Sequence, residues 1–88
     1  AAGFEVLGGL LEAFVTTVND LAAHGSHASS KSRMLIHLIP EPFAGPGRRP
    51  VDDPYRRVLA ITDFVSGMTD SYAVALFKKL TGISLPTG

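Results

Sequence analysis

Two long stretches of the chain repeat apolar residues at alternating steps of three and four positions, the spacing of one helix face. The first stretch runs from Gly3 to about Ala23 and predicts a long helix. Its face consists of six large apolar residues: Phe4, Leu7, Leu11, Phe14, Val18 and Leu21. The pair Gly8-Gly9 costs such a helix about 1 kcal/mol per glycine relative to alanine, so we expect another backbone to approach closely there.

The second stretch runs from Pro54 to about Leu80 and predicts a kinked helix pair. The apolar positions of this stretch shift round the helix near Gly67. We therefore expect a kink or a break there, with Thr69 or Asp70 capping the second half. The apolar positions before and after the shift are Val58, Ile61, Val65, Met68 and Tyr72, then Ala73, Leu76, Phe77 and Leu80.

Turn-forming residues separate the two stretches. Gly25 is expected to end the first helix. Ser29 or Ser30 is expected to cap a short helix from Lys31 to about Ile39, which the proline at the next position ends.

Residues 40–53 hold four prolines and two glycines, which predict a Pro/Gly-rich loop without regular structure. Phe43 is expected to anchor this loop. Asp52 or Asp53 can cap the following helix, whose first turn tolerates Pro54 because the first N–H groups of a helix have no partner within it.

At the end of the chain, Lys78 and Lys79 are expected in the last helical turn, where the negative end of the helix dipole favours cations. Gly82 is expected to end the helix, and residues 83–86 to follow as an extended tail. The predicted architecture is all-α: a long helix, a short helix and a kinked C-terminal helix pair, joined by the Pro/Gly-rich loop.

Composition narrows the functional classes. The 88 residues suffice for one small helical domain over residues 1–88, and 45% hydrophobic content suffices for a core. Eight Lys and Arg balance eight Asp and Glu, so no basic surface for nucleic acid or an anionic membrane is expected. Glu5, Glu12 and Asp20 interrupt the first apolar stretch and argue against a membrane span. The absence of cysteine excludes disulfides, zinc-thiolate sites and a cysteine nucleophile.

The chain begins at Ala1 without an initiator methionine, and its mean hydropathy is +0.23. Small domains bury only about 60% of their unfolded surface, so part of this apolar surface is expected to meet a partner. We therefore expect a piece of a longer protein.

Three sets of polar residues are candidates for chemistry. His24 and His27 have the spacing of metal ligands, with His37 further on, but they lack neighbouring thiolates and have only Asp20 as a nearby carboxylate, so exposed loop histidines are the favoured interpretation.

Two dibasic pairs, Arg48-Arg49 and Arg56-Arg57, could hold a phosphate group. Because no Gly-rich cradle accompanies them, a solvated surface neutralised by Asp52 and Asp53 is favoured.

Asp63 and Asp70 lie seven residues apart, on one face of a straight helix, which would suit acid and base chemistry. A kink would separate them. The favoured interpretation is that Asp70 or Thr69 caps the second helix, while Asp63 faces solvent or pairs with Arg56 or Lys78. No catalytic residue and no metal ligand is assigned to this chain, because no Ser-His-Asp arrangement and no phosphate loop is present.

The run DFVSGMTDSYA at residues 63–73 resembles a motif near the C-terminus of bacterial dGTPases, the deoxynucleotide triphosphohydrolases of the HD superfamily. Similar segments are GGLLEAF at 8–14, RVL at 57–59 and FKKLTGI at 77–83. The resemblance covers nearly the whole chain, and the Pro/Gly-rich loop diverges most. It identifies the chain as similar to the C-terminal associated region of these enzymes.

The resemblance implies a parent enzyme that hydrolyses a dNTP to the deoxynucleoside and triphosphate with a divalent metal. The family's metal ligands lie upstream of the matched region and include a His-Asp pair, which this chain lacks. The chain alone is therefore expected to be inactive and to hold no cofactor. Its expected partners are the upstream HD catalytic domain of the same parent chain and further copies in a homo-oligomer.

Within the motif, the resemblance implies packing roles for Gly67 and Met68. Four further residues are candidates for lining the nucleotide pocket or a subunit contact: Asp63, Thr69, Asp70 and Tyr72.

An alternative from a different class is a free-standing helical interaction or oligomerisation module without catalytic activity, with the face from Phe4 to Leu21 as its contact surface. A cytoplasmic location is expected from the missing signal sequence and cysteines.

Overall fold

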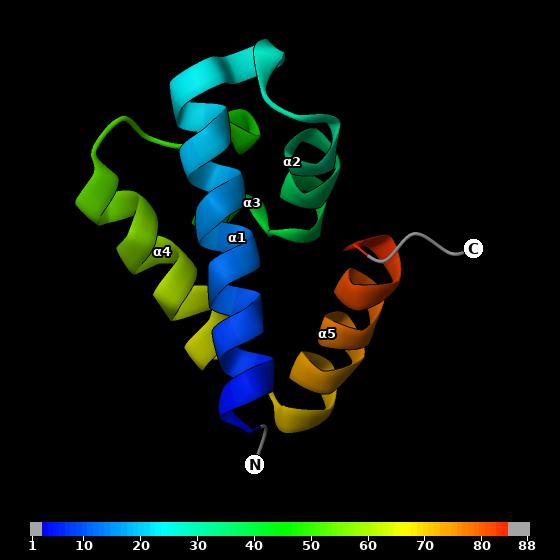
Figure 1. Ribbon diagram of the computed structural model, residues 1–88. Helices are drawn as coiled ribbons and strands as arrows, with labels where there is room; N and C mark the ends of the chain where they lie inside the picture. The colour runs from blue at the N-terminus through cyan, green and yellow to red at the C-terminus, as the bar shows by residue number, and fades with distance from the viewer. Residues whose placement is uncertain (1–2, 85–88) are drawn as a thin grey trace.

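The computed structural model describes residues 3–84, and all regular secondary structure in that range is helical. The long helix α1 (Phe4–His24) runs through the middle of the molecule (Figure 1). Helix α4 (Pro54–Ser66) packs along one side of α1, and α2 (Ser30–Leu35) and α5 (Asp70–Ser84) pack along the other. The short helix α3 (Glu41–Ala44) packs against α4. This arrangement confirms the all-α prediction.

Three single-turn 3₁₀ helices connect the longer elements: η1 (Gly25–His27), η2 (Ile36–Leu38) and η3 (Pro46–Arg48). The short second helix was predicted to continue to about Ile39, and α2 followed by η2 confirms this extent. The tighter 3₁₀ turn is a common way to end an α-helix.

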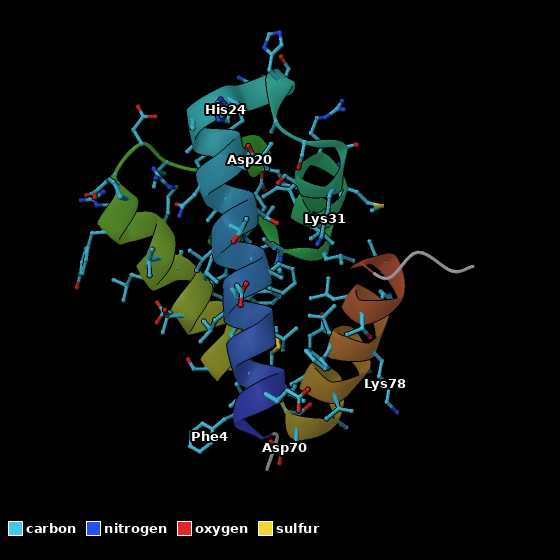
Figure 2. The ribbon with its side chains drawn as sticks, viewed as in Figure 1. Phe4, Asp20, His24, Lys31, Asp70 and Lys78 are labelled. Carbon is cyan, nitrogen blue, oxygen red and sulfur yellow. The ribbon has the colours of Figure 1, made fainter. Side chains whose placement is uncertain are left out.

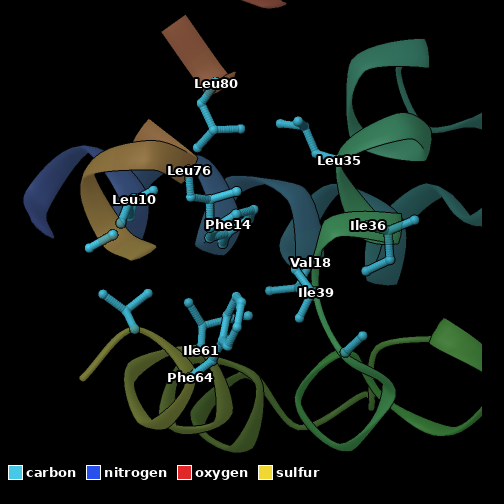
Figure 3. Close-up of a cluster of buried hydrophobic side chains, with 13 residues drawn as sticks. Leu10, Phe14, Val18, Leu35, Ile36, Ile39, Ile61, Phe64, Leu76 and Leu80 are labelled. Carbon is cyan, nitrogen blue, oxygen red and sulfur yellow. The ribbon is translucent and has the colours of Figure 1, made fainter. Parts of the chain in front are cut away.

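The core lies where α1 meets the other helices, and Figure 3 shows its side chains converging from α1, α2, α4 and α5. Burying a large apolar side chain contributes about 1.5–3 kcal/mol, so this cluster supplies most of the favourable free energy of folding. The buried members are Leu10, Phe14, Val18, Leu35, Ile36, Ile39, Ala44, Ile61, Phe64, Val65, Ala73, Leu76 and Leu80.

The buried face of α1 is centred on Leu10, Phe14 and Val18, slightly to one side of the predicted face. Leu7 and Leu11 are half-buried at its edges. The prediction for Phe4 is wrong: its side chain is 97% exposed. Figure 2 shows Phe4 pointing away from the bundle at the free end of α1, where no other helix covers it.

One of the two adjacent glycines of α1 marks a close helix contact. A Cβ atom at Gly9 would lie 2.5 Å from Cε1 of Phe77, whereas a Cβ atom at Gly8 would have nothing within 4 Å. A close approach was predicted here, but it comes from an aromatic side chain of α5 and not from a backbone.

The turn after α1 forms as predicted. Gly25 adopts a φ of 54° and donates its N–H to the carbonyl of Leu21. Such a positive φ is favourable mainly for glycine. Ser29 caps α2 by accepting a hydrogen bond from the N–H of Ser32, and the N–H of Ser29 donates to a carboxylate oxygen of Asp20 at 3.0 Å. This bond ties the turn back onto α1.

The prediction that residues 40–53 lack regular structure is wrong, because α3 and η3 both form there. Both helices carry proline in their first turn, where a missing N–H costs no intrahelical bond. Gly45 separates them with a φ of 114°, and a Cβ atom at this position would collide with the carbonyl oxygen of Arg49. Phe43 anchors the segment as predicted, since its ring stacks on Phe64 with centroids 5.3 Å apart.

The C-terminal helix pair forms with a break between Ser66 and Asp70, as predicted. Asp53 caps α4 by accepting a hydrogen bond from the N–H of Tyr55 at 3.0 Å. Val58, predicted in the apolar stripe, is exposed instead. The buried face of α4 is formed by Ile61, Phe64 and Val65, since α1 and α3 cover only that side.

The prediction for the end of α5 is also wrong. Gly82 lies inside the helix, which continues to Ser84, so Lys78 and Lys79 precede its last turn. Glycine disfavours a helix interior by only about 1 kcal/mol, which does not suffice to stop one. The rest of the predicted tail, residues 85–86, lies outside the described residues.

Between residues 3 and 84, one helical segment has the length and composition to cross a membrane, the stretch Phe4–His27 that joins α1 and η1. This differs from the expectation that Glu5, Glu12 and Asp20 make it too polar. Core helices of globular proteins pass the same test, and α1 packs its apolar face against α2, α4 and α5.

Candidate functional site

A shallow, open cavity of about 470 Å³ lies at the junction of α4 and α5. Five of the six motif residues singled out from the sequence line it: Asp63, Gly67, Met68, Thr69 and Tyr72. Its remaining lining residues come from the segment after η2 and from α3 and α4, and they are Pro40, Phe43 and Phe64. We call this cavity the junction groove.

Local hydrogen bonding produces the break that opens the junction groove. The N–H of Gly67 donates to the carbonyl of Asp63 at 3.2 Å, and the N–H of Met68 donates to the carbonyl of Val65 at 3.2 Å. Thr69 then restarts the helix, because its hydroxyl oxygen accepts a hydrogen bond from the N–H of Tyr72 at 3.2 Å. The sequence offered Thr69 and Asp70 as alternative caps of α5, and the structure shows that Thr69 caps it.

The glycine of the motif lies directly after α4 and close to the last turn of that helix. Gly67 has ordinary right-handed dihedral angles, φ −84° and ψ −4°. A Cβ atom there would lie 3.3 Å from the carbonyl oxygen of Asp63, which is tighter than usual. A side chain at position 67 would therefore crowd the end of α4. Within residues 3–84, no other helix approaches Gly67 closely.

The groove has an apolar floor and a polar rim. The rings of Phe43 and Phe64 stack at an interplanar angle of 27°, and Met68 is half-buried against the core beside them. Asp63 and Tyr72 remain exposed, with 49% of Tyr72 accessible to solvent. Such a groove suits a planar or apolar group that carries a hydrogen-bonding edge.

The break separates the two carboxylates whose spacing suggested acid and base chemistry. Asp63 lines the junction groove near the end of α4, whereas Asp70 begins α5 and does not line it. Figure 2 shows Asp70 at the foot of the molecule, near the start of α1. Within residues 3–84, Asp63 makes no ion pair with Arg56 or Lys78, and Asp53 is the carboxylate that pairs with Arg56, at 3.7 Å.

The histidines do not assemble into a metal site within the described residues. His24 ends α1, His27 lies in η1 and His37 lies in η2, all three exposed. Across residues 3–84, no group of three or more His, Asp or Glu side chains is placed to hold a metal ion.

The two dibasic pairs have different surroundings. Arg57 is tied down, because its Nε donates to Oδ1 of Asn19 and one Nη donates to the carbonyls of Val51 and Asp52. Arg48 and Arg49 line a second cavity together with Arg33 of α2, a residue that no motif in the sequence marks. No sequence signal joins Arg33 to this pair, because 14 intervening positions separate it from Arg48 along the chain.

Comparison with known protein families shows to which family the chain is related. The family model described as the phosphohydrolase-associated domain matches residues 34–79, just over half of the chain. The chain belongs to the phosphohydrolase-associated domain family. The matched range includes the whole motif around the junction groove.

Curated relatives extend the match of this phosphohydrolase-associated domain to nearly its full length. A deoxyguanosinetriphosphate triphosphohydrolase-like protein of Synechocystis is 38% identical over 96% of this chain and 17% of the relative. Proteins of the same name match from Listeria monocytogenes, at 34% over 94% of this chain and 19% of the relative, and from Pseudomonas aeruginosa, at 37% over 89% and 16%.

These matches confirm the resemblance to dGTPase-like proteins that the sequence motif indicated. The phosphohydrolase-associated domain described here spans less than a fifth of the length of these relatives, so the relatives are longer chains that contain it as one region. No solved structure matches the chain.

Proposed function

We propose that this chain is the helical C-terminal part of a dGTPase-like enzyme, which hydrolyses a dNTP to the deoxynucleoside and triphosphate. The observation that carries this proposal is the match of 94–96% of the chain to proteins named as deoxyguanosinetriphosphate triphosphohydrolase-like. In this proposal the chemistry takes place in an upstream HD domain, which also binds the divalent metal. The chain has no His-Asp dipeptide, and its described residues form no metal-binding group, so no step is assigned to a metal here.

The proposed role of this chain within the enzyme is to dock onto the catalytic domain and support it. An exposed apolar face on α4 supports this role. Val58 and Leu59 follow Tyr55 by three and four positions, so both lie beside Tyr55 on one side of the helix, and the three residues are between 42% and 73% exposed. An apolar cluster of this kind is typical of a surface that another domain covers.

The junction groove is the second proposed contact. Its apolar floor and its polar rim of Asp63, Thr69 and Tyr72 suit either a loop of the catalytic domain or the edge of the nucleotide. We favour the scaffold role, because capping by Thr69 and packing by Met68 already account for those two side chains. The carboxylate of Asp63 makes no hydrogen bond or ion pair within residues 3–84, so Asp63 is the best candidate for a direct contact.

The alternative is a free-standing helical interaction module. Its expected contact surface, the face of α1 from Phe4 to Leu21, packs mostly into the core, so that surface is not available. The exposed face of α4 would have to serve instead. A module of this kind would associate with itself without any upstream domain.

The reading frame upstream of the codon for Ala1 separates these functions. A histidine codon followed some tens of codons later by a His-Asp pair would support the triphosphohydrolase. A start codon directly before Ala1 would overturn it and leave the interaction module as the function.

Asp63→Asn in that longer enzyme tests the role of the groove. If Asp63 touches the nucleotide, kcat/KM for dGTP should fall by about tenfold or more, because a hydrogen bond to a charged group contributes about 1.5–3 kcal/mol, while Tm stays unchanged. Asp52→Asn, an exposed aspartate outside the groove, is the matched control and should leave the kinetics unchanged. Unaltered kinetics for Asp63→Asn with a lowered Tm would assign Asp63 to the domain contact.

A further inference from the structure

Three arginines from two distant parts of the chain line one open cavity of about 470 Å³. Arg33 belongs to α2, Arg48 is the last residue of η3, and Arg49 directly follows η3. Gly25 and Ser26 of η1 complete the polar part of the lining, and no carboxylate lines the cavity. We propose that this arginine cavity binds a phosphate-bearing small molecule.

None of the three guanidinium groups is neutralised by a carboxylate within residues 3–84, and that of Arg33 is also oriented. Nε of Arg33 donates to the carbonyl of Ala28 at 3.2 Å, which directs the side chain and leaves both of its Nη atoms without a partner among residues 3–84. The side chains of Arg48 and Arg49 make no hydrogen bond or ion pair within the same range. Planar guanidinium forks with unused donors are the groups that bind phosphate most effectively in proteins.

The backbone that carries Arg48 is held in an unusual conformation. Arg48 is the one non-glycine residue between positions 3 and 84 with a positive φ, at 57°. The turn is braced by Oε2 of Glu41, which accepts a hydrogen bond from the N–H of Gly47 at 2.7 Å, and by the carbonyl of Gly45, which accepts one from the N–H of Arg48 at 2.8 Å. The two arginines are therefore presented from a defined turn and not from a free loop.

The surroundings favour an anion over a structural ion pair. The dibasic pair at the start of α4 shows the contrast, since Arg56 has its carboxylate in Asp53 and Arg57 has three oxygen acceptors. The arginine cavity concentrates three positive charges in a chain whose formal net charge is zero. Its other walls are apolar, formed by Leu21, Ala22 and Pro50, and could hold a non-phosphate part of a ligand. The proposal rests on these contacts and stands independently of the proposed enzyme function.

The test is a calorimetric titration of the 88-residue protein with inorganic triphosphate at about 0.15 M salt, an ionic strength that screens diffuse attraction. We expect binding that Arg48→Gln and Arg49→Gln each weaken by about tenfold or more, the fold-change expected for losing a charge-assisted hydrogen bond. Arg33→Gln should act similarly. Thermal unfolding of each variant checks that the fold is retained.

Arg56→Gln is the matched control, because it removes one positive charge outside the arginine cavity. It should change the affinity by less than about twofold, as expected for an exposed charge at a distance. Absence of triphosphate binding to the wild-type protein would overturn the proposal. Equal weakening by Arg56→Gln and Arg49→Gln would also overturn it, since the attraction would then be diffuse.

A parallel titration with dGTP distinguishes two sources of the phosphate group. Equal affinities for dGTP and triphosphate would assign the arginine cavity to polyphosphate alone. Tighter binding of dGTP would place the nucleoside against the apolar wall of Leu21, Ala22 and Pro50. Both results support a phosphate site, and amide shifts of Gly25 and Ser26 in NMR spectra would locate it on the protein.

Discussion

At the scale of single residues, adjacent identical residues have different roles in this protein. Gly8 faces open space, whereas Gly9 faces the ring of Phe77. Gly9→Ala is expected to destabilise the protein by about 1–3 kcal/mol, because the added methyl group would overpack the contact between α1 and α5. Gly8→Ala is expected to stabilise it by up to about 1 kcal/mol through helix propensity. Urea unfolding of both variants measures the difference.

A double-mutant cycle provides the control for this contact. Gly9→Ala should be much less harmful in a Phe77→Ala background, where the ring that occupies the space is gone. Equal destabilisation by Gly9→Ala in both backgrounds would show that Phe77 does not lie against position 9.

Asp20 gives the protein a pH-dependent contribution to stability. The hydroxyl of Ser32 and the N–H of Ser29, in that order, lower the pKa of Asp20 below its ordinary value. Because the folded-state pKa is depressed, the stabilisation is present above about pH 4, the unfolded value, and is lost as the pH falls through the folded-state pKa. Asp20→Asn should therefore lower Tm at pH 7, and the difference from wild type should shrink as the pH falls below about 4.

Glu12→Gln serves as the comparison for Asp20→Asn, since it removes the same charge from an exposed position on the same helix. Its effect on Tm should be smaller at pH 7. A Tm difference for Asp20→Asn that stays constant down to pH 2 would contradict the proposed hydrogen-bonded carboxylate.

At the scale of elements, α4 has one face in the core and another in solvent. Ile61 is fully buried and Leu59 is 45% exposed, although both are large aliphatic residues two positions apart. Ile61→Ala is expected to cost about 2–5 kcal/mol through transfer and cavity terms, and Leu59→Ala about 0.5 kcal/mol or less. Denaturant unfolding of the 88-residue protein compares the two, and similar losses would mean that α4 is rotated relative to the structure.

The same elements show what the residue pattern can predict. Helix caps are local, so Ser29, Asp53 and the break after Gly67 were predictable from a few neighbouring residues. The sequence pattern does not predict the helices between Pro40 and Asp53, because proline occurs both in the first turn of a helix and in irregular structure. The pattern also does not predict the continuation of α5 past Gly82, because the cost of one glycine is smaller than the gain from a continued helix.

At the scale of the whole molecule, the proposed docking changes the expected effect of Leu59→Ala. In the longer enzyme, the face of Tyr55, Val58 and Leu59 would be covered by the catalytic domain. The same substitution should then cost about 1–3 kcal/mol, or a corresponding loss in Tm, because a buried leucine loses its contacts. Thermal unfolding of the longer enzyme with and without the substitution measures this cost, and an unchanged Tm there would exclude α4 from the domain contact.

The sequence by itself determined the helical class, most helix ends and the family, since periodicity, caps and the motif at residues 63–73 depend on neighbours along the chain. The tertiary structure alone decided which members of each predicted apolar face are buried. It left Phe4 and Val58 in solvent, separated Asp70 from the junction groove, and brought Arg33 to Arg48 and Arg49. These outcomes depend on which helix lies opposite each residue, and packing between distant segments is not encoded in local spacing.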